Sequence, residues 1–434
     1  MNMTETETKL RRIACLSKRE PERTFINLMC MFNKEALKGC FDALDRNKAI
    51  GIDGVTKSEY ALNLDENLEE LIARMKRMAY RPGPVKQVLI PKEGRPGATR
   101  PLGISNLEDK IVQKMMQKVL ESIYEPTFLD CSYGFRPGRG CHDAIKDLQN
   151  HLYYNEVQVV LDIDLANFFG SIDHKLMEEI LRKKIHDKTL MRYIIRMFKA
   201  GVLAEGDLQV SNEGVPQGSI CSPVLANIFA HEAIDRWIEE MVRPNCRGEV
   251  KLFRYADDSV VCCQYKEDAK RINEVLGKRL AKFKLRINED KTKLVPFSKK
   301  EAAQGKSQGA FDFLGFTFYL GRSRRGHINP KVKTSGKKFR AKLKNVKDWC
   351  KAVRNRIKLG EIWKTFRAKI RGHVQYYGVS YNTDKVDEFI DRATKILFKW
   401  LNRRSQKRSF DWDKFNKFSR RYPLAKATVV YPLF

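Results

Sequence analysis

Two adjacent aspartates, Asp257 and Asp258, lie between apolar runs in the segment FRYADDSVVCC (253–263). Neighbouring carboxylates repel one another, and burying them is costly unless another group compensates their charge. A divalent cation such as Mg²⁺ would compensate it, because Mg²⁺ prefers carboxylate oxygens and is usually shared with substrate phosphates. An acid pair in a type I′ turn at an exposed hairpin tip is the alternative. The segment therefore predicts either a metal site for phosphoryl chemistry or a solvated turn.

A third acid is available in VVLDIDLANFFGSIDH (159–174), where Asp164 ends an apolar, β-branched run. If this run and the segment around YADD form neighbouring strands, Asp164 and Asp257 converge. Two metal ions about 4 Å apart could then activate an attacking hydroxyl and stabilise a leaving phosphate. Taken alone, Asp164 is equally explained as a cap at the end of a strand. The catalytic interpretation therefore requires the two strands to be neighbours.

Hydrophobic periodicity predicts the elements that must position these acids. Apolar and alternating runs predict strands at 85–92, 157–164, 285–297 and 311–320, and a β-hairpin at 250–264 with YADD at its tip. Helical spacing predicts helices within 1–50, 65–80, 105–124, 174–200, 222–242 and 267–284, with loops at 93–100 and 298–309. After Arg322 the pattern is helical and basic to the end. The expected fold class is α+β.

The composition narrows the class of protein. The 434 residues suffice for two or three domains, and no stretch approaches the roughly 18 apolar residues of a membrane span. The first residues, MNMTETETKLRRIAC, lack the apolar core of a signal peptide. The ten cysteines form no CxxC pair, which argues against structural zinc and a disulfide framework. Reduced thiols in a cytosolic protein are therefore expected.

The positive charge is concentrated in the last quarter of the chain. Residues 321–434 hold 32 Lys and Arg but 8 Asp and Glu, a net charge of +24 out of +30 for the whole chain. Such a field attracts a polyanion, most commonly a nucleic acid, although a highly soluble surface is the alternative. The densest patch is NRRSQKRS, in which we expect four residues to contact nucleic-acid phosphates: Arg403, Arg404, Lys407 and Arg408.

Seven segments in order resemble the reverse transcriptases of group II introns: RPLGISNLEDKIVQ, SYGFRPGRGCHDAI, DIDLANFFGSIDH, GVPQGSICSPVLAN, FRYADD, LRINEDKTKL and FLGFTF. The stretch GHVQYYGV (372–379) resembles the signature of that family's thumb, or domain X, and the whole chain resembles the compact IIC-type maturases. The resemblance implies a right-hand polymerase with fingers, an antiparallel palm sheet and a helical basic thumb. It implies an N-terminal RNA-binding extension at 1–50, fingers and palm at 51–320, a thumb at 321–390, and a DNA- or RNA-binding segment at 391–434.

The resemblance also implies roles for individual residues. The catalytic metal ligands would be Asp164, Asp257 and Asp258, with Leu165 as a further metal contact. Asp162 fits a looser spacing, but Asp164 is preferred because the family's aromatic residue five positions on is then Phe169. Phe169 would exclude a 2′-hydroxyl from the incoming nucleotide, with core packing as the alternative. Further nucleotide contacts, each otherwise a surface or turn residue, would be Lys92, Arg100, Gln217 and Lys291. Phe313, Leu314 and Gly315 would grip the primer terminus, or would belong to a plain half-buried strand.

The implied function is that of an RNA-directed DNA polymerase, a nucleotidyltransferase that uses Mg²⁺, or alternatively Mn²⁺. Such a protein is encoded by a group II intron, assists splicing by binding the intron RNA, and copies RNA into cDNA during intron mobility, or retrohoming. The expected partners are intron RNA, an RNA template with a DNA primer, target DNA and dNTPs, with a homodimer possible, no membrane, and a location in the bacterial cytoplasm.

Other functions remain open at this stage. One is a maturase that only assists splicing; others are an RNA-dependent RNA polymerase, or a reverse transcriptase of the retron, diversity-generating or CRISPR-associated kind. Phe169 argues against ribonucleotide substrates, and the thumb-like stretch and basic tail argue against the other reverse transcriptases. The family often adds a C-terminal endonuclease with paired cysteines and histidines, and this sequence ends at Phe434 without one. We therefore expect the enzyme to extend an existing 3′ end.

Overall fold

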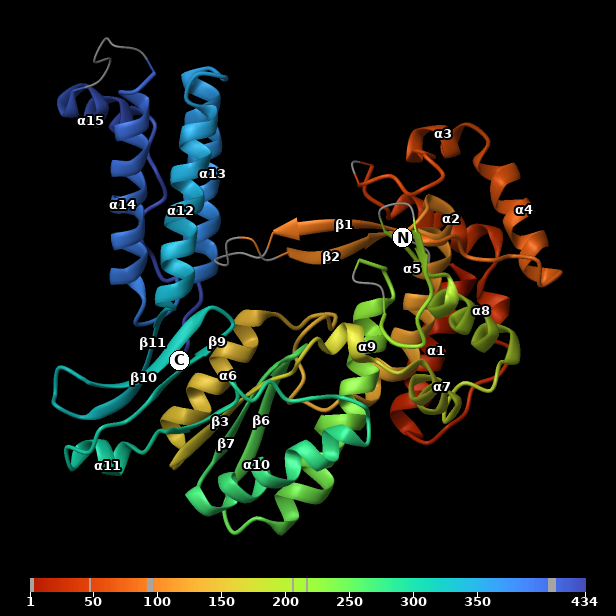
Figure 1. Cartoon of the computed structure of the whole chain (residues 1–434), viewed down its shortest axis with the longest axis horizontal. Helices are drawn as coiled ribbons and strands as arrows, with labels where there is room; N and C mark the ends of the chain where they lie inside the picture. Colours follow the sequence, from red (N-terminus) through yellow and green to blue (C-terminus); the bar gives the residue numbers. More distant parts are fainter. Residues whose placement is uncertain are drawn as a thin grey trace.

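The computed structural model describes residues 4–46, 48–91, 97, 99–204, 207–215, 218–404 and 411–434. Its elements form three regions (Figure 1): N-terminal helices with a long β-hairpin, a central sheet flanked by helices, and a C-terminal helical bundle on a small sheet. One hydrophobic core joins the N-terminal helices to one face of the central sheet, and a second joins the opposite face to the bundle. The predicted α+β class and the right-hand arrangement are confirmed.

The N-terminal region is built around α5 (Leu107–Tyr124), much of which is buried. Helices α1 (Glu5–Arg19) and α2 (Lys34–Asp42) pack against α5, and α4 (Leu64–Lys76), which follows α3 (Lys57–Leu62), packs against α2. A capping box begins α1, because the side chain of Thr4 accepts a hydrogen bond from the backbone of Glu7 while the Glu7 side chain accepts one in return.

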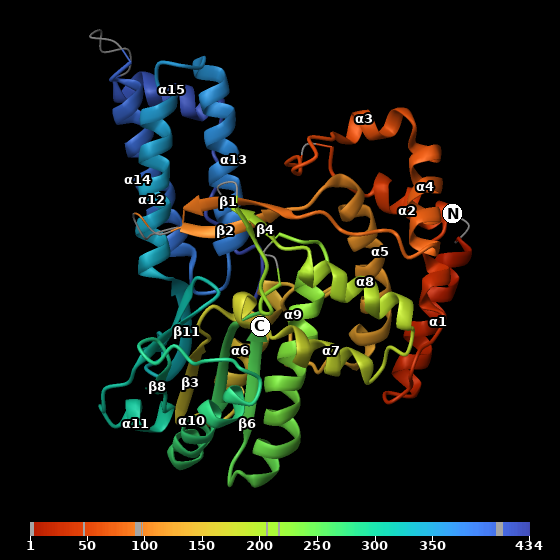
Figure 2. The same ribbon diagram turned by 45° about the vertical axis from the view of Figure 1, so that its right-hand side comes forward.

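A hairpin of β1 (Val85–Pro91) and β2 (Thr99–Ile104) reaches from this region towards the C-terminal bundle in both orientations shown (Figures 1 and 2). Two short strands, β4 (Val202–Ala204) and β5 (Asp207–Gln209), extend its sheet to the order β2-β1-β4-β5. β4 and β5 were not predicted, because three residues show too little alternation to identify a strand.

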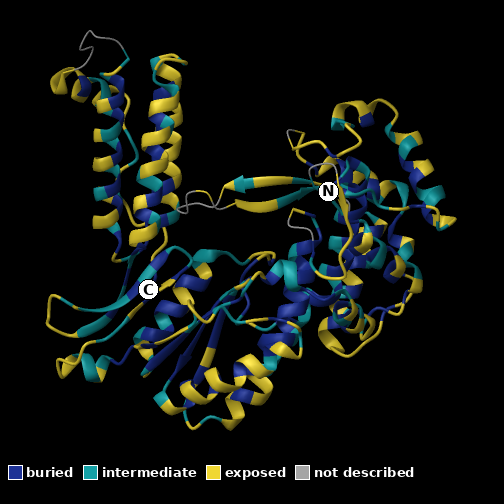
Figure 3. Ribbon diagram, viewed as in Figure 1, coloured by how far each residue is buried: buried dark blue, intermediate teal, exposed yellow. Residues whose placement is uncertain are grey.

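The central sheet has the order β6-β7-β3-β8, and its neighbouring strands are antiparallel. The strands are β3 (Val159–Asp164), β6 (Val250–Tyr255), β7 (Asp258–Cys263) and β8 (Lys293–Pro296). Apolar side chains of α6 (Cys141–Tyr154) cover one face and those of α10 (Lys266–Ala281) the other. The inner strands are therefore buried on both sides (Figure 3), which explains their almost continuous apolar sequence.

Helices also connect the central sheet to the N-terminal region. α7 (His174–Arg182) and α8 (Lys188–Lys199) pack against each other, and α9 (Ser222–Ala230) packs against α5. The helix of α9 continues through two π-helical turns, His231–Asp235 and Ile238–Val242, so the predicted helix at 222–242 is confirmed.

The C-terminal region begins with a sheet of order β11-β10-β9, formed by β9 (Ala310–Phe313), β10 (Phe316–Arg322) and β11 (Ile328–Thr334). Its helices are α12 (Gly336–Val353), α13 (Leu359–Tyr377), α14 (Thr383–Leu401) and α15 (Trp412–Arg421). Large apolar residues are buried between these helices, whereas exposed residues line their outer faces (Figure 3). Among all the helices that the structure describes, none combines the length and apolarity needed to cross a membrane.

Several boundaries differ from those predicted. The single strand predicted at 311–320 is a hairpin whose turn is Leu314–Gly315, and only Lys293–Pro296 of the segment 285–297 is a named strand. A short helix, α11 (Lys299–Ala303), lies in the predicted loop. β11 lies where a helical pattern was expected, because its lysines alternate with buried residues. The boundary predicted at residue 390 falls inside α14, and the predicted domain limits remain untested.

Candidate active site

The acids identified in the sequence lie at one end of the central sheet, where β3 ends and the β6–β7 hairpin turns. In the antiparallel register of β3 and β7, Asp164 is directly opposite Asp258, and Asp162 is opposite Val260. Directly opposed residues have Cβ atoms only about 4.5–5.5 Å apart. Asp257 immediately precedes Asp258 in the turn, so the neighbouring strands required by the catalytic interpretation are confirmed and bring the three carboxylates to one edge.

The turn that presents Asp257 has two residues, Ala256 and Asp257, because Tyr255 pairs with Asp258 across the hairpin. Ala256 has a φ of +58°, in the left-handed region that residues with a Cβ rarely adopt. Of these two residues, Ala256 alone has a positive φ, so this is not the type I′ turn considered as the alternative. A conformation of this kind costs roughly 1–3 kcal/mol and persists where its surroundings hold it.

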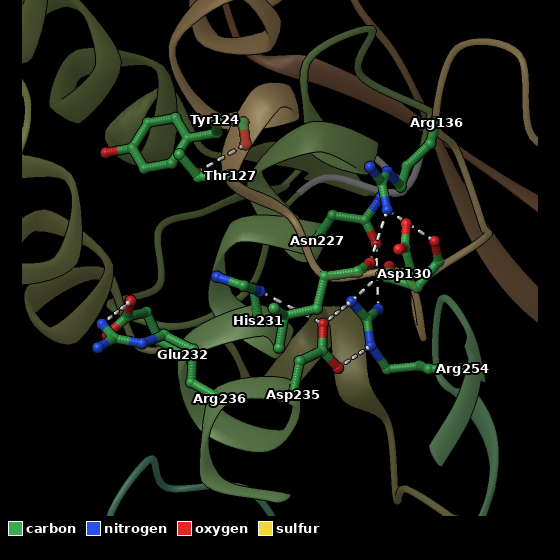
Figure 4. Close-up of polar contacts among 12 residues, drawn as sticks. Tyr124, Thr127, Asp130, Arg136, Asn227, His231, Glu232, Asp235, Arg236 and Arg254 are labelled. Atoms are coloured by element: carbon green, nitrogen blue, oxygen red, sulfur yellow. Dashed lines mark hydrogen bonds and ion pairs between the residues drawn. The ribbon is translucent and has the colours of Figure 1, made fainter. Parts of the chain in front are cut away.

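A buried arginine, Arg254, is hydrogen-bonded to this turn and paired with Asp235 (Figure 4). Its Nη1 donates to the carbonyl of Ala256 at 3.1 Å, and its Nε and Nη2 donate to the two carboxylate oxygens of Asp235, each at 2.6 Å. The guanidinium also donates to Oδ1 of Asn227 at 3.1 Å and to Oγ of Ser132 at 2.7 Å. Burial alone would favour a neutral Asp235, but the ion pair with Arg254 keeps its pKa below the ordinary value. Arg254 therefore connects the turn to the helix at 222–242 through hydrogen bonds to both.

The segment SYGFRPG (132–138) packs against the same turn. Asn227 donates to the carbonyl of Gly134 at 2.6 Å, and a Cβ built on Gly134 would lie 2.5 Å from the backbone nitrogen of Ala256. A side chain at position 134 would therefore displace the turn, which gives a physical reason for glycine in this motif.

Burial and neighbouring carboxylates raise the pKa of Asp162, Asp257 and Asp258. Burial raises the pKa of Asp258 to about 7, and the carboxylates of Asp162, Asp257 and Asp164 add to the shift. Burial likewise raises the pKa of Asp162 to about 6, with further contributions from Asp164 and Asp312. Partial desolvation and the charge of Asp164 also raise the pKa of Asp257. The edge therefore concentrates negative charge that a bound cation would stabilise.

A lysine of the protein already contacts one of these acids. Nζ of Lys291 lies 2.7 and 2.8 Å from the two carboxylate oxygens of Asp164. The same loop binds the backbone of Asp164: the N–H of Asn288 donates to its carbonyl at 2.8 Å, and the hydroxyl of Thr292 accepts from its N–H at 3.3 Å. The predicted contact of Lys291 with nucleotide phosphates remains untested, and the structure places its ammonium group at the acidic edge.

This edge has the donors that a hard divalent cation prefers. Its side-chain ligands are carboxylates, the usual ligands of such cations, and the ammonium of Lys291 shows that Asp164 accepts a positive charge there. Within the described part of the chain, no three Asp, Glu, His or Cys side chains are already arranged as a metal site, and Asp164 faces Lys291 instead. The side chain of Leu165 is buried and has no donor atom, so this residue could offer a cation only its carbonyl oxygen.

Phe169 follows Asp164 by five residues, in the 3-10 helix Phe168–Ser171 that comes after β3. Its half-buried ring packs edge-on against Phe168 and Phe135, with centroid distances of 5.5 and 6.5 Å. The ring is therefore held by packing without being covered, which is compatible with both predicted roles.

Of the three remaining predicted nucleotide contacts, the structure describes Arg100 alone. Arg100 is exposed on β2, opposite Ile90 in the hairpin. Lys92 and Gln217 lie outside the described residues. Their contacts with a nucleotide stay predictions.

The predicted primer-grip segment is attached to the acids. Phe313 is buried in the core, whereas Leu314 and Gly315 form the turn between β9 and β10. The N–H of Leu314 donates to Oδ2 of Asp258 at 3.3 Å. This turn therefore contacts the acids, and its contact with a primer stays a prediction.

Two arginines of the predicted basic patch contact other residues of the protein. The guanidinium of Arg403 lies 5.3 Å from the ring centroid of Trp400, and Nη2 of Arg404 donates to the carbonyl of Ile357 at 3.2 Å. Lys407 and Arg408 lie outside the described residues. Contact of this patch with nucleic acid remains a prediction.

Arg254 and Asp235 were not predicted from the sequence. Arg254 occupies a strand position whose neighbours on the same face, Val250 and Leu252, are in the core, and Asp235 lies in the apolar helical run ANIFAHEAID. A charged residue at a core position signals a buried partner. Each segment contains such a charged residue, but the sequence of one segment does not identify the other as its partner.

The central sheet resembles the palm of a polymerase and has paired acids at one edge. Together with the hairpin and the helical bundle that flank it, this sheet defines a nucleic-acid polymerase of the right-hand type. The model of the reverse transcriptase (RNA-dependent DNA polymerase) family matches residues 90–318, and the chain belongs to this family. The predicted activity, RNA-directed DNA polymerase, is thereby confirmed, and enzymes of this family generally use divalent metal ions.

The curated relatives support the resemblance found in the sequence. Protein YkfC of Escherichia coli (strain K12) is 33% identical over 64% of this chain and 78% of its own length. The group II intron-encoded protein LtrA of Lactococcus lactis subsp. cremoris is 31% identical over 58% of this chain but only 42% of its own. An uncharacterized 91 kDa protein in the cob intron of Schizosaccharomyces pombe is 36% identical over 40% of this chain and 21% of its own length. The match therefore spans less than half of the two intron-associated relatives.

Proposed function

We propose that this reverse transcriptase serves a group II intron and copies RNA at the edge formed by Asp164, Asp257 and Asp258, with Mg²⁺ as its cation. The observation that carries the site is the register of β3 and β7, which sets Asp164 opposite Asp258 and beside Asp257. When bound there, Mg²⁺ would lower the pKa of a primer 3′-hydroxyl and neutralise the leaving pyrophosphate.

The chain's own residues position the reactants in this proposal. The three carboxylates would hold the cation, and Phe169, five residues after Asp164 with its ring packed on Phe135, would limit the space at the sugar. Lys291 exchanges its contact with Asp164 for the phosphates of the incoming nucleotide, because a cation bound by Asp164 would repel its ammonium group. Positioning and charge neutralisation suffice for phosphoryl transfer, so no covalent nucleophile is needed.

The intron role rests on the relatives and on charge. LtrA is named as a group II intron-encoded protein, and the C-terminal quarter of this chain has a net charge of +24. Structured RNA is recognised by its shape, phosphates and 2′-hydroxyls, which suits an extended basic surface. We therefore include intron RNA, target DNA and template–primer duplex as partners, and a homodimer as a further assembly to test.

Primer extension on an RNA template tests the proposal. Extension with dNTPs that requires Mg²⁺ and stops with a chelator supports it; incorporation of ribonucleotides alone would identify an RNA polymerase instead. Binding of a group II intron RNA in the same buffer should weaken steeply as salt rises, because each phosphate contact releases counterions. Tight RNA binding without extension would support a protein that only assists splicing.

A further inference from the structure

The turn Leu314–Gly315 lies between the acidic edge and the thumb helix α13. Both residues adopt left-handed backbone angles, with φ of +51° and +81°. The N–H of Leu314 donates to Oδ2 of Asp258 at 3.3 Å, and its carbonyl accepts from the hydroxyl of Tyr376 on α13 at 2.9 Å. A single residue therefore connects a proposed metal ligand to the thumb.

Both tyrosines of GHVQYYGV contact this turn. The hydroxyl of Tyr377 would lie 3.1 Å from a Cβ built on Gly315, so the two side chains enclose the turn from the side of α13. The ring of Tyr376 also stacks on Phe316, with centroids 5.8 Å apart and an interplanar angle of 20°. This stacking holds the ring in place independently of its hydroxyl.

The end of α13 is itself anchored to the central region. Nε2 of His142, on α6, lies 2.8 Å from the carbonyl of Tyr376. A carbonyl can only accept, so Nε2 carries the proton and donates. The His142 ring also stacks on Tyr431, with centroids 3.9 Å apart. A continuous chain of contacts thus runs from α6 through Tyr376 and Leu314 to Asp258.

The Leu314 N–H matters because Asp258 is repelled by its neighbours. Within the described residues, no other donor lies at hydrogen-bonding distance from the Asp258 carboxylate. If the Leu314 carbonyl were released, the turn could rotate and the direction of its N–H would change. The orientation of Asp258 thus depends on what holds that carbonyl.

We propose that Tyr376 is a positioning residue, whose hydroxyl fixes the Leu314 carbonyl so that the Leu314 N–H orients Asp258 for metal binding. The proposal rests on the proposed function, in which Asp258 is a metal ligand. Because α13 belongs to the basic bundle proposed to bind the template–primer duplex, this hydroxyl also couples the position of the thumb to the metal site.

The variant Tyr376→Phe removes the hydroxyl but keeps the stacked ring. In single-turnover primer extension, we expect the Mg²⁺ concentration that gives half the maximal rate to rise about 2- to 10-fold, the range for one lost hydrogen bond. The rate should recover in large part at saturating Mg²⁺. The melting temperature of the metal-free protein and its affinity for the duplex should match those of the wild type.

Tyr381→Phe is the matched control, because it removes a hydroxyl from a more exposed tyrosine near α13, whose ring packs on Phe434. It should leave the Mg²⁺ dependence unchanged. Gly315→Ala perturbs the same turn from the other side, by backbone strain and contact with Tyr377, and should raise the Mg²⁺ requirement at least as much as Tyr376→Phe.

An unchanged Mg²⁺ requirement in Tyr376→Phe would overturn the proposal. So would a loss of duplex affinity or melting temperature without a shift in Mg²⁺ dependence, because that pattern indicates a structural role alone. Failure of the proposed function is distinguishable, since the wild-type protein would then show no Mg²⁺-dependent extension at all.

Discussion

Variants of the ion pair between Arg254 and Asp235 test whether the turn that presents Asp257 is held by residues outside its own hairpin. Both side chains are buried, with relative exposures of 1% and 0%. Arg254→Met leaves a buried carboxylate without its partner and also removes the donor to the Ala256 carbonyl. Asp235→Leu leaves a buried guanidinium but keeps that donor. The double variant removes both charges.

The structure sets the expected magnitudes. Removing one partner of a buried pair costs about 3–5 kcal/mol, whereas replacing both by apolar groups is often neutral. For a cooperative region of 150–250 residues, each kcal/mol lowers the melting temperature by about 2–4 °C. Each single variant should therefore melt about 6–20 °C below the wild type, and the double variant should recover most of this loss.

Activity should not recover with stability. The double variant still lacks the bond between Arg254 and the Ala256 carbonyl, and nothing else described holds that carbonyl in the left-handed turn. We expect its extension rate to stay about 10-fold or more below the wild type, since a donor to a strained turn offsets roughly 1–3 kcal/mol. Melting curves from circular dichroism and single-turnover extension measure the two effects separately.

Arg236→Met is the control for this cycle, because Arg236 lies on the same helix as Asp235 and forms pairs near the surface. One is with the partly buried Glu232 (Figure 4) and the other with the exposed Glu240. Exposed pairs contribute about 0–1 kcal/mol, so its melting temperature should change little. If the double variant regains both stability and full activity, Arg254 does not hold the turn, and the reasoning is refuted.

Two further predictions concern Phe169 and His373. Phe169→Ala should increase ribonucleotide incorporation relative to dNTPs, because it removes the ring proposed to exclude a 2′-hydroxyl; an unchanged ratio would remove Phe169 as the gate. His373 is buried against Phe389, and burial lowers its pKa to about 3. The unfolded chain therefore takes up a proton below about pH 6.5 that the folded chain excludes, so stability is complete above that pH and is lost as the pH falls towards 3. As the pH falls from 7 to 5, the free energy of unfolding of His373→Phe, measured by thermal denaturation, should rise by about 2 kcal/mol relative to that of the wild type. A difference between the two proteins that stays constant over this range would contradict the assignment of a neutral His373.

The strands that carry the acids were predictable because their local pattern is strong. The runs VVLDID and SVVCC are apolar and β-branched, and both are strands in the structure. The sequence did not show that these two strands pair, because their register depends on contacts between segments far apart in the chain. The position of Asp164 opposite Asp258 therefore had to come from the structure.

The elements and contacts that were not predicted are either short or depend on a residue far away in the chain. β11 alternates half-buried lysines with buried residues, and its basic composition resembles that of the helices that follow. The turn Leu314–Gly315 lay inside an apolar run, so the run was predicted as one strand. The network of Arg254 and the contact of Tyr376 with Leu314 join three-dimensional neighbours, and no local pattern in either segment identifies its partner.

The most direct test of the account is single-turnover extension of a DNA primer on an RNA template by Asp257→Ala, with RNA-binding affinity measured on the same preparation. Asp257 is exposed at the turn, so its replacement should not impair folding, and Asp290→Ala serves as an exposed control in the nearby loop. The account predicts that Asp257→Ala loses extension at saturating Mg²⁺ while it binds RNA like the wild type, and that Asp290→Ala retains both. Extension by Asp257→Ala at the wild-type rate would contradict the assignment of this edge as the catalytic site.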